Sequence, residues 1–393
     1  MSKIIYLNSH PIQYLSPLLK QLSNAVQLRV GYLSKAGLGT IKDKGFGEVI
    51  TWDEPLLEGY ASFFIPNLRG STPMDNGFLD AINPGVFKVL LSSPEKIIVL
   101  NGWSYLTNWL VFIFGPILGK EIWLRAESPL NQELRKSKKV LFVKKILLKH
   151  FLFKFLVKRF LYIGSQNKAF YNYYGVDDNR LIFTPYAVDN EKFRAKYNSN
   201  LPVLKDLRAS LKIPTNLKII LFSGKYITKK RPLDLLHAFE NLASEGYGLI
   251  FLGDGMLRSE MESYVSSRKL KNVWLTGFVN QSQIDKYYSI ADVFVMTSGV
   301  GETWGLSVNE AMNFSLPVIV STTCGSSFDL VEEGENGYTY TEGDIEALTK
   351  AIRYVFDEHK KCERMGNRSF EIVQGFSIEK SVTNISKTVN KLN

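Results

Sequence analysis

The sequence predicts an α/β protein made of two doubly wound domains, each with a parallel β-sheet. Its 393 residues are too many for one ordinary core and suit two domains of roughly 150–200 residues. Hydrophobic residues make up 45% and charged residues 22% of the chain, which is a normal globular balance. Short β-branched runs alternate with longer amphipathic stretches, the pattern of parallel strands separated by helices.

The expected strands fall into two sets. In the first half they are Lys3–Leu7, Gln27–Leu33, Lys96–Leu100, Glu121–Arg125 and Arg159–Ile163. In the second half they are Lys218–Ser223, Gly248–Leu252, Val273–Thr276, Val293–Met296 and Pro317–Ser321. Helical patterns lie at Pro232–Ser244, Met256–Ser267, Gln281–Ser289 and Gly305–Asn313. Two such sets indicate two Rossmann-like domains.

The domain boundary is expected between Tyr186 and Asn216, where Asn198–Pro202 is polar and turn-rich. We therefore predict an N-terminal Rossmann-like domain at residues 1–200 and a C-terminal one at 201–376. A final helical pattern, at about residues 377–393, is expected to pack back on the first domain.

Composition narrows the function classes. The formal net charge is +10 and the pI is near 9.2, which favours acidic partners. The cysteines (Cys324, Cys362) and histidines (His10, His150, His237, His359) are few and scattered, and no Asp-x-Asp triplet occurs. This argues against a disulfide framework and against a protein-built metal centre. The N-terminal apolar run is too short for a secretory signal.

One uncharged stretch, Ile97–Gly119, has the length of a membrane span. Polar residues and Pro116 interrupt it. It is therefore interpreted as a buried strand at Ile97–Leu100, a turn, and a buried helix.

The most informative motif runs from Ser298 to Met312, after the strand Val293–Met296. Its glycines lead into a helix whose first amides, at Gly305 and Leu306, predict an anion site. Glu302 and Glu310 flank that helix start, and carboxylates there suit sugar or ribose hydroxyls. The alternative is that Glu302 caps the helix and Glu310 is a solvated surface residue.

A second motif, from Leu221 to Pro232, also leaves a strand and enters a helix. It concentrates four cations. Lys225 on the approach, and Lys230 or Arg231 on the far side, could hold a diphosphate. The alternative is a solvated basic loop. Two weaker turns follow later strands, at Leu252–Gly255 and at Thr276–Val279, where exposed backbone could meet a base.

Strand ends in the first half offer further candidates, because ligands bind at the carboxyl ends of strands in open α/β sheets. His10 and Gln13 follow the first strand, and Arg125 and Glu127 lie at the end of another. Alternatively, His10 caps the next helix, and Arg125 and Glu127 belong to a structural ion pair.

Residues 136–159 contain nine basic residues and no acidic one, interleaved with large apolar side chains. A basic amphipathic helix suits an anionic membrane surface. The alternative is a helix that covers the sheet with long cationic stems. Among the functions that suit a basic chain, nucleic-acid binding is the least favoured. The basic residues alternate with large apolar side chains and not with exposed aromatic stacking motifs.

Seven of these elements, in order between Ile219 and Asp344, resemble the second half of a family 4 (GT4) retaining glycosyltransferase with the GT-B fold. They are Ser-Gly-Lys…Lys-Lys-Arg-Pro, Leu-Gly-Asp-Gly, Thr-Gly-Phe-Val, Ala291–Val295, Glu-Thr-Trp-Gly-Leu…Asn-Glu-Ala-Met, Leu316–Ile319 and Glu335–Tyr338. The first half resembles bacterial surface-polysaccharide transferases through Asn8–Tyr14.

The resemblance implies site roles. Glu302 and Lys230 would be the catalytic pair. Glu310 would bind the donor ribose. The remaining donor-binding positions would be Lys225, Arg231, Gly277, Phe278, Val279, Thr303, Gly305 and Leu306. His10, Gln13, Arg125 and Glu127 would contact acceptor or sugar. Lys225 stands where many relatives carry arginine.

The predicted function is retaining, metal-independent sugar transfer in a cleft between the two domains. A nucleotide-sugar is the donor substrate, with no cofactor, and a glycan or lipid-linked molecule is the acceptor, in cell-surface polysaccharide synthesis. The expected location is cytoplasmic, peripheral on the inner face of the cell membrane. Alternatives are a nucleotide-sugar epimerase of GT-B fold and a non-catalytic nucleotide- or glycan-binding relative.

Overall fold

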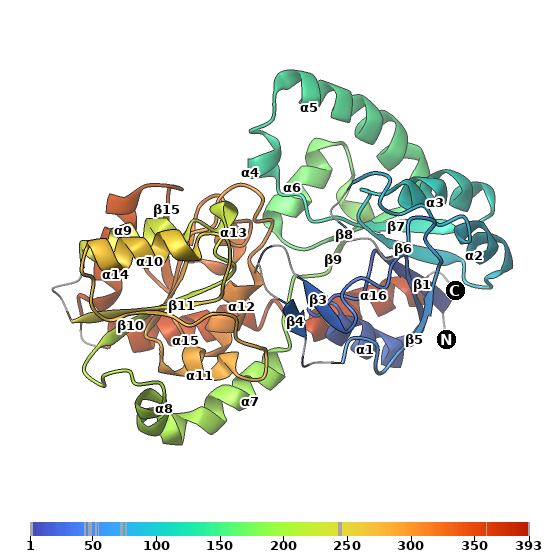
Figure 1. The fold of residues 1–393 in the computed structure, drawn as a ribbon. Helices are drawn as coiled ribbons and strands as arrows, with labels where there is room; N and C mark the ends of the chain where they lie inside the picture. Colours follow the sequence, from blue (N-terminus) through green and yellow to red (C-terminus); the bar gives the residue numbers. More distant parts are fainter. Residues whose placement is uncertain are drawn as a thin grey trace. The chain divides into compact units, whose positions relative to one another are not determined.

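The computed structural model describes residues 3–42, 45, 49–51, 53, 55–70, 74, 77–242, 246–358 and 360–391 (Figure 1). His359, Ser244 and the last two residues of the expected C-terminal helix lie outside the described residues. The chain forms two compact units. Unit 1 comprises Met1–Ile41, Glu54–Tyr186 and Ile378–Asn393, and unit 2 comprises Lys42–Asp53 and Ala187–Ser377.

Unit 1 is built on a parallel sheet whose described strands have the spatial order β5-β2-β1-β6-β7-β8-β9. The strands are β1 (Lys3–Asn8), β2 (Gln27–Tyr32), β5 (Ala61–Phe64), β6 (Ile97–Asn101), β7 (Glu121–Arg125), β8 (Arg159–Tyr162) and β9 (Leu181–Phe183). Its helices are α1 (Ser16–Ala25), α2 (Val86–Ser92), α3 (Leu106–Ile117), α4 (Leu130–Glu133), α5 (Lys138–Lys144), η1 (Lys145–Leu156), α6 (Ser165–Tyr173), η2 (Asp178–Arg180) and α16 (Ile378–Asn390). A separate two-stranded sheet pairs β3 (Thr40–Lys42) with β4 (Val49–Thr51).

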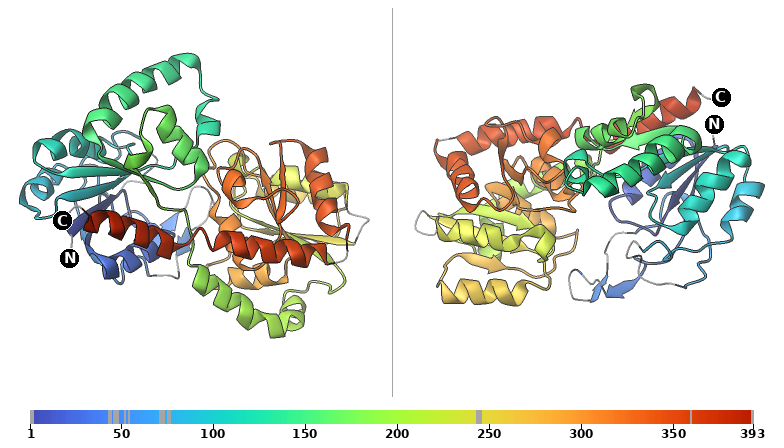
Figure 2. Two further views of the ribbon diagram at one scale, coloured as in Figure 1. Left: turned by 180° about the vertical axis from the view of Figure 1, so that it is seen from behind. Right: turned by 90° about the horizontal axis from the view of Figure 1, so that it is seen from above.

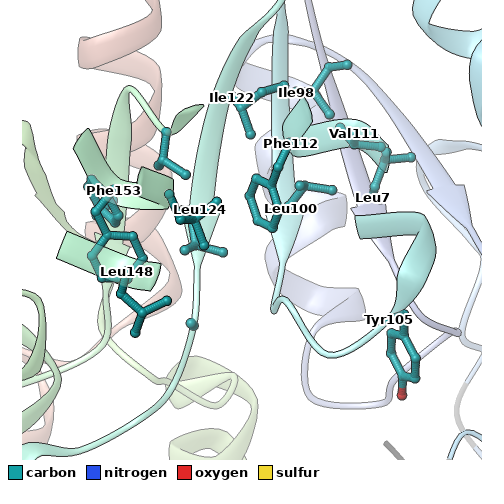
Figure 3. Close-up of a cluster of buried hydrophobic side chains, with 14 of the residues drawn as sticks. Leu7, Ile98, Leu100, Tyr105, Val111, Phe112, Ile122, Leu124, Leu148 and Phe153 are labelled. Atoms are coloured by element: carbon teal, nitrogen blue, oxygen red, sulfur yellow. The ribbon is translucent and has the colours of Figure 1, made fainter. Parts of the chain in front are cut away.

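Helices α3 and η1 cover one face of the unit 1 sheet. Figure 3 shows Phe153 and Leu148 of η1 beside Leu124 of β7, and Phe112 of α3 beside Leu100 of β6. These side chains are at most 3% exposed, so they form the core of this unit. Helices α1 and α16 pack against each other (Figure 2), so the C-terminal helix packs on unit 1 as expected.

Unit 2 has a parallel sheet with the described order β12-β11-β10-β13-β14-β15. The strands are β10 (Lys218–Ser223), β11 (Tyr247–Leu252), β12 (Val273–Leu275), β13 (Val293–Met296), β14 (Val318–Ser321) and β15 (Gly337–Tyr340). Its helices are α7 (Asn190–Asn200), η3 (Leu201–Val203), α8 (Leu204–Ser210), η4 (Thr228–Lys230), α9 (Pro232–Glu240), α10 (Arg258–Ser267), α11 (Ile284–Ile290), α12 (Leu306–Asn313), α13 (Ser327–Leu330), α14 (Ile345–Phe356) and α15 (Lys361–Val373).

The two doubly wound parallel sheets confirm the predicted fold class. All ten expected strands form, each within about a residue of its predicted ends. The short edge strands β5, β9 and β15 escaped the sequence analysis, because three or four residues give too little periodicity. The boundary between the units falls after Tyr186 instead of after residue 200, since α7 packs on α11 and α12 of unit 2.

The stretch Ile97–Gly119 forms a buried strand, a turn and helix α3, as interpreted, but that helix is only half buried. Val111 and Phe112 face the core, whereas Ile113, Phe114 and Ile117 are 38%, 37% and 73% exposed. The expectation of a buried helix was therefore wrong for its outer face. Among the described residues, no helix combines the length and apolar character needed to cross a membrane.

Phe153 and Phe155 give a matched test of this packing. Phe153 is 1% exposed and contacts the rings of Trp103, Phe160 and Tyr171, whereas Phe155 is 64% exposed. Phe153→Ala is expected to lower the free energy of unfolding by about 3–5 kcal/mol, and Phe155→Ala by less than about 0.5 kcal/mol. Urea unfolding midpoints measure both; equal midpoints would contradict the assigned orientation of η1.

Candidate functional site

The predicted motifs of unit 2 come together at the carboxyl edge of its sheet. Strands β10 and β13 are hydrogen-bonded neighbours. The loop at residues 224–231 follows β10, and the loop at 297–305 follows β13. Open α/β sheets place their ligand sites at this edge. The sequence pattern alone could not show that these two loops lie side by side.

An ion pair joins the two loops. The Lys230 ammonium donates a hydrogen bond to the Glu302 carboxylate, and the side chains of both residues are largely buried, at 17% and 10% exposure. Burial acts to raise the pKa of Glu302, but the positive charges of Lys230 and Lys229 outweigh it and hold that pKa below its ordinary value. Glu302 is therefore ionised. It makes no cap at the start of α12, contrary to the structural alternative.

Backbone contacts fix the same two loops. The Thr297 hydroxyl donates to the Lys230 carbonyl at 2.7 Å, and the Gly299 amide donates to the Lys229 carbonyl at 2.8 Å. The Lys229 ammonium donates to the Gly301 carbonyl, also at 2.8 Å. Lys230 thus projects from a turn whose main chain is held on both sides, which pre-organises its charge.

Glu310 lies on α12 and is held by two polar side chains. The Tyr288 hydroxyl donates to its Oε2 at 2.7 Å, and the Gln281 amide donates to its Oε1 at 3.3 Å. Burial raises the pKa of Glu310 to about 7, against the opposing effects of Tyr288 and Lys230. Glu310 is thus no solvated surface residue. It is half buried and close enough to Lys230 to feel its charge.

The start of α12 is open in the predicted manner. Gly305 has φ +94°, a left-handed conformation that favours glycine, and the amides of Gly305 and Leu306 donate no hydrogen bond within the described part of the chain. Gly325 packs closely against this turn. A Cβ at this position would lie 1.9 Å from the carbonyl oxygen of the half-buried Thr303, so the close approach requires glycine. These amides, with the helix dipole, can receive an anion.

The two other predicted cations differ in their surroundings. Lys225 is half buried on the loop after β10. The Arg231 guanidinium donates to Asp234 at 2.7 Å and lies 3.7 Å from Glu342. Since two carboxylates engage it, the structure favours a role for Arg231 in holding the loop, where its own φ of +50° is left-handed.

The turn at Gly277–Val279 follows β12 at the same edge and is half buried. The Gly253 amide donates to the Gly277 carbonyl at 3.1 Å, which ties it to the Leu252–Gly255 turn. Asp254 accepts from Arg258 at 2.6 Å and from the Gly255 amide. The two weak turn motifs therefore form one braced structure.

A second polar cluster lies in unit 1, at the carboxyl ends of β1 and β7. Asn8 and Arg125 are 1% and 3% exposed, and Tyr6 is fully buried. Within the described residues, no hydrogen bond is made by the Tyr6 hydroxyl, by either amide atom of Asn8, by Nε2 of Gln13, or by Nε and Nη1 of Arg125. Buried polar atoms normally find partners, so these atoms are candidate contacts for a polar ligand.

The aromatic rings of Tyr14 and Tyr186 border this cluster. The Arg125 guanidinium lies 5.0 Å from the Tyr186 ring centroid, and the two tyrosine rings are 5.3 Å apart. Glu127, half buried, interacts electrostatically with Arg125. Two of the predicted residues, Arg125 and Glu127, thus take part in one cluster.

His10 occupies a different setting. Its Nδ1 is 3.0 Å from the Ser9 hydroxyl, and burial lowers its pKa. It does not cap the next helix, since α1 begins at Ser16 without a side-chain cap. The role of His10 in contacting acceptor or sugar stays a prediction.

Several residues of these sites escaped the sequence analysis. Tyr288 and Gln281 were inside or near a predicted helix but gave no signal, because their contact with Glu310 spans separate elements. Asn8 lies in the Asn8–Tyr14 motif, for which no residue role was predicted at that position, and Tyr186 was predicted only as one end of the domain boundary. Position at a strand end was the only available signal for Asn8.

The arrangement of possible metal ligands and of the cysteine near the site bears on metal binding. Among the described residues, no group of three or more histidine, cysteine, aspartate or glutamate side chains could hold a metal ion. Cys324 is buried beneath the 297–305 loop, where burial raises its thiol pKa to about 12. Its Sγ donates to the Trp304 carbonyl at 2.6 Å.

The two Rossmann-like parallel-sheet units define the GT-B class of glycosyltransferase folds, as predicted. A solved Anabaena structure, of Alr3699/HepE in complex with UDP-glucose, matches with a TM-score of 0.73 at 18% identity, over 100% of both chains. At that identity the match shows the fold alone.

Sequence comparisons agree with this class. Residues 204–371 match the model of the family described as Glycosyl transferases group 1. Alpha-monoglucosyldiacylglycerol synthase of Acholeplasma laidlawii is 30% identical over 45% of this chain and 44% of its own length. The UDP-Gal:alpha-D-GlcNAc-diphosphoundecaprenol alpha-1,3-galactosyltransferase of Escherichia coli is 29% identical over 53% of this chain and 54% of its own.

The chain spans about half the length of the curated relatives it matches. The matches indicate a GT-B glycosyltransferase group that resembles family 4. The range of the family model, residues 204–371, lies within unit 2, which contains the Lys230–Glu302 pair.

Glu310 gives a pH test of the unit 2 site. Its folded pKa of about 7 lies above the ordinary value near 4.3. The wild-type free energy of unfolding should therefore fall as pH rises from about 4 through 7, because the folded state retains the proton that the unfolded state releases. Glu310→Gln has no titrating carboxyl at this position. Between about pH 4 and pH 7 its free energy of unfolding should therefore rise by on the order of 2 kcal/mol relative to that of the wild type.

Urea titrations at a series of pH values measure the difference. Glu346→Gln, at an exposed position on α14, is the control and should follow the wild-type curve. A constant difference between Glu310→Gln and wild type would show that Glu310 titrates normally.

Proposed function

We propose that this protein is a retaining, metal-independent glycosyltransferase of the family 4 type. It transfers a hexosyl group from a nucleotide-sugar to a glycan or a lipid-linked acceptor in cell-surface polysaccharide synthesis. The observation that carries the proposal is the buried Lys230–Glu302 pair beside the open start of α12 and the polar-bound Glu310.

The donor role of unit 2 follows from its charges. The Lys230 ammonium and the Gly305 and Leu306 amides supply preorganised positive potential for a diphosphate, with Lys225 on the approach. Glu310 accepts hydrogen bonds from ribose hydroxyls, and the Gly277–Val279 turn receives the base. A solved structural neighbour is described as a complex with UDP-glucose, which supports this donor class.

The chemical step breaks the bond between the anomeric carbon and a diphosphate oxygen, whose electrons leave with the nucleoside diphosphate. Lys230 and the helix amides stabilise the charge that develops on that oxygen, which is usually the largest catalytic contribution at such sites. Glu302, neutralised by Lys230, is a weak nucleophile. Its role in this mechanism is to position the lysine. The acceptor hydroxyl attacks from the face that the diphosphate leaves, and its proton passes to the departing diphosphate oxygen.

The acceptor role falls to unit 1. The unpartnered atoms of Asn8, Gln13 and Arg125 can bind hydroxyl or anionic groups, and the Tyr14 and Tyr186 rings can pack against a sugar face. His10 and Glu127 extend the same edge. Curated relatives named above are described as acting on a diacylglycerol and on a diphosphoundecaprenol, which supports a lipid-linked acceptor.

The proposed place of action is the cytoplasmic face of the cell membrane, reached through the basic segment 136–159. No cofactor is included in the proposal, since the donor itself brings the activated group.

The direct test is a thermal-shift screen with a panel of sugar nucleotides, followed by product analysis. We expect one donor to raise the melting temperature and to give a glycosylated product with retained anomeric configuration. Conversion of the sugar nucleotide without an acceptor would identify an epimerase, and binding without turnover would identify a non-catalytic relative.

Lys230→Met should lower kcat/KM by roughly 10²–10³-fold, because it removes charge at the leaving group. Lys205→Met, at an exposed lysine of α8, is the control with the same chemical change and should retain full activity. Steady-state kinetics with the identified donor measure both. Thermal melts are run alongside, because removing one partner of a buried pair also destabilises the fold.

Asn8→Ala separates acceptor binding from folding. Since neither amide atom of Asn8 has a partner in the described structure, its loss should barely change the melting temperature. The acceptor KM should rise about tenfold, the value of one lost hydrogen bond, while the donor KM stays constant. A large fall in melting temperature with an unchanged acceptor KM would assign Asn8 to structure.

A further inference from the structure

A cavity of about 510 Å³ opens in unit 1 at the edge of the sheet opposite the candidate acceptor cluster. Its lining includes Lys120 and Glu121, at the start of β7, and Val157 and Lys158, just before β8. The acceptor cluster lies at the carboxyl ends of β1 and β7, so the two sites are separated by the length of the strands. The cavity is therefore independent of the proposed transfer chemistry.

The cavity is strongly cationic. Lys120, Lys154, Lys158 and Arg180 line it, against the single carboxylate of Glu121. Glu121 accepts from the Trp123 indole at 2.8 Å and lies 4.0 Å from Arg159, so its charge is already partly balanced. The net field inside therefore favours an anionic ligand.

The backbone organises these cations. Lys120 donates to the carbonyls of Ser93 and Glu95 at 2.5 and 2.9 Å, and Arg180 donates to the carbonyl of Phe153 at 2.5 Å. Within the described residues neither forms an ion pair with a carboxylate, although the charge of Asp177 acts on Arg180. Lys154 and Lys158 are exposed and likewise lack a carboxylate partner in the described part of the chain.

An apolar surface continues from the rim of this cavity. Phe155, which lines it, is 64% exposed, and Ile117, next to the lining residue Pro116, is 73% exposed. On η1 the exposed apolar residues Ile146, Phe151 and Phe155 recur at intervals of five and four, while Leu148, Leu152 and Phe153 face the core. Figures 1 and 2 show the α5–η1 run as one long outer helix of unit 1.

The exposed apolar side chains of α5, η1 and α3 form what we call the outer apolar face. They are Val140, Phe142, Val143, Ile146, Leu147, Phe151 and Phe155, together with Ile113, Phe114, Ile117 and Leu118. Isolated apolar residues on a surface need no explanation, but a contiguous set of this kind marks an interaction surface. Exposed lysines at 138, 139, 145, 154 and 158 accompany it.

We propose that the outer apolar face docks on an anionic lipid bilayer and that the cavity beside it binds a lipid headgroup phosphate. Apolar side chains enter the interface while the flanking lysines meet the headgroups. The lysines select a bilayer over a protein partner, because apolar and cationic groups are interleaved along the whole face without one carboxylate at residues 136–159.

The proposal rests on the membrane contact suggested above and not on the transfer reaction. Its test is flotation of the full-length protein with vesicles of phosphatidylcholine alone, or of equal parts phosphatidylcholine and phosphatidylglycerol, without any sugar donor. Failure of the two proposals is then distinguishable, because donor binding is measured separately by thermal shift.

Two pairs of substitutions remove equal charge. Lys154→Gln with Lys158→Gln removes cavity cations, and should weaken binding to the anionic vesicles by about a hundredfold or more, because each charge-assisted contact to phosphate is lost. Lys139→Gln with Lys145→Gln removes exposed lysines of the same helical run outside the cavity lining. This second pair of substitutions should weaken binding by at most about thirtyfold, which is the loss expected from removing two positive charges near an anionic membrane surface.

Phe155→Ser should weaken vesicle binding by roughly tenfold or more through lost apolar burial. Met256→Ser, at a 77% exposed position of unit 2, should have no effect. Circular dichroism checks that each variant is folded.

Three outcomes would overturn the proposal. Equal binding to both vesicle types would exclude recognition of anionic lipid. Equal losses from the two lysine pairs would exclude the cavity as a headgroup site. Complete displacement from vesicles by inorganic phosphate, at a concentration equal to that of lipid phosphate, would assign the cavity to a soluble anion.

Discussion

The buried contact between Lys230 and Glu302 is the constraint on which the unit 2 site depends. Two loops that follow neighbouring strands β10 and β13 meet there, and each supplies one charge. A buried pair adds little net stability, since desolvation offsets most of the attraction. Its value here is positional. The ammonium is fixed beside the open start of α12, and the lysines keep the pKa of Glu302 below its ordinary value.

The second carboxylate has the opposite electrostatic character. Glu310 is about half protonated near pH 7 because burial raises its pKa, whereas Glu302 is held ionised by lysines. Two glutamates eight positions apart on one loop–helix segment thus serve different chemical purposes. Glu302 balances the charge of a lysine. Glu310 can accept a hydrogen bond from a hydroxyl when it is ionised and can donate one when it is protonated.

The fold and the motif-bearing loops could be predicted from the sequence, because strands such as Glu121–Arg125 and Val293–Met296 are continuous apolar runs between turns that contain glycine. The contacts formed across elements could not be predicted from it. Tyr288 approaches Glu310 only through the packing of α11 on the same sheet face, and Arg231 is diverted to Asp234 and Glu342 by its left-handed backbone. In unit 1 the burial of Asn8 and Arg125 follows from strand order, which no local pattern encodes.

The backbone at Arg231 has a consequence for how the chain can vary in length. Its left-handed conformation ends the short turn η4 and is followed at once by Pro232, the first residue of α9. The turn leads directly into the helix through Arg231 alone. One residue inserted or deleted between Gly224 and Arg231 would therefore move Lys230 away from the Glu302 carboxylate. Insertions and deletions should therefore be absent from the connection between β10 and α9.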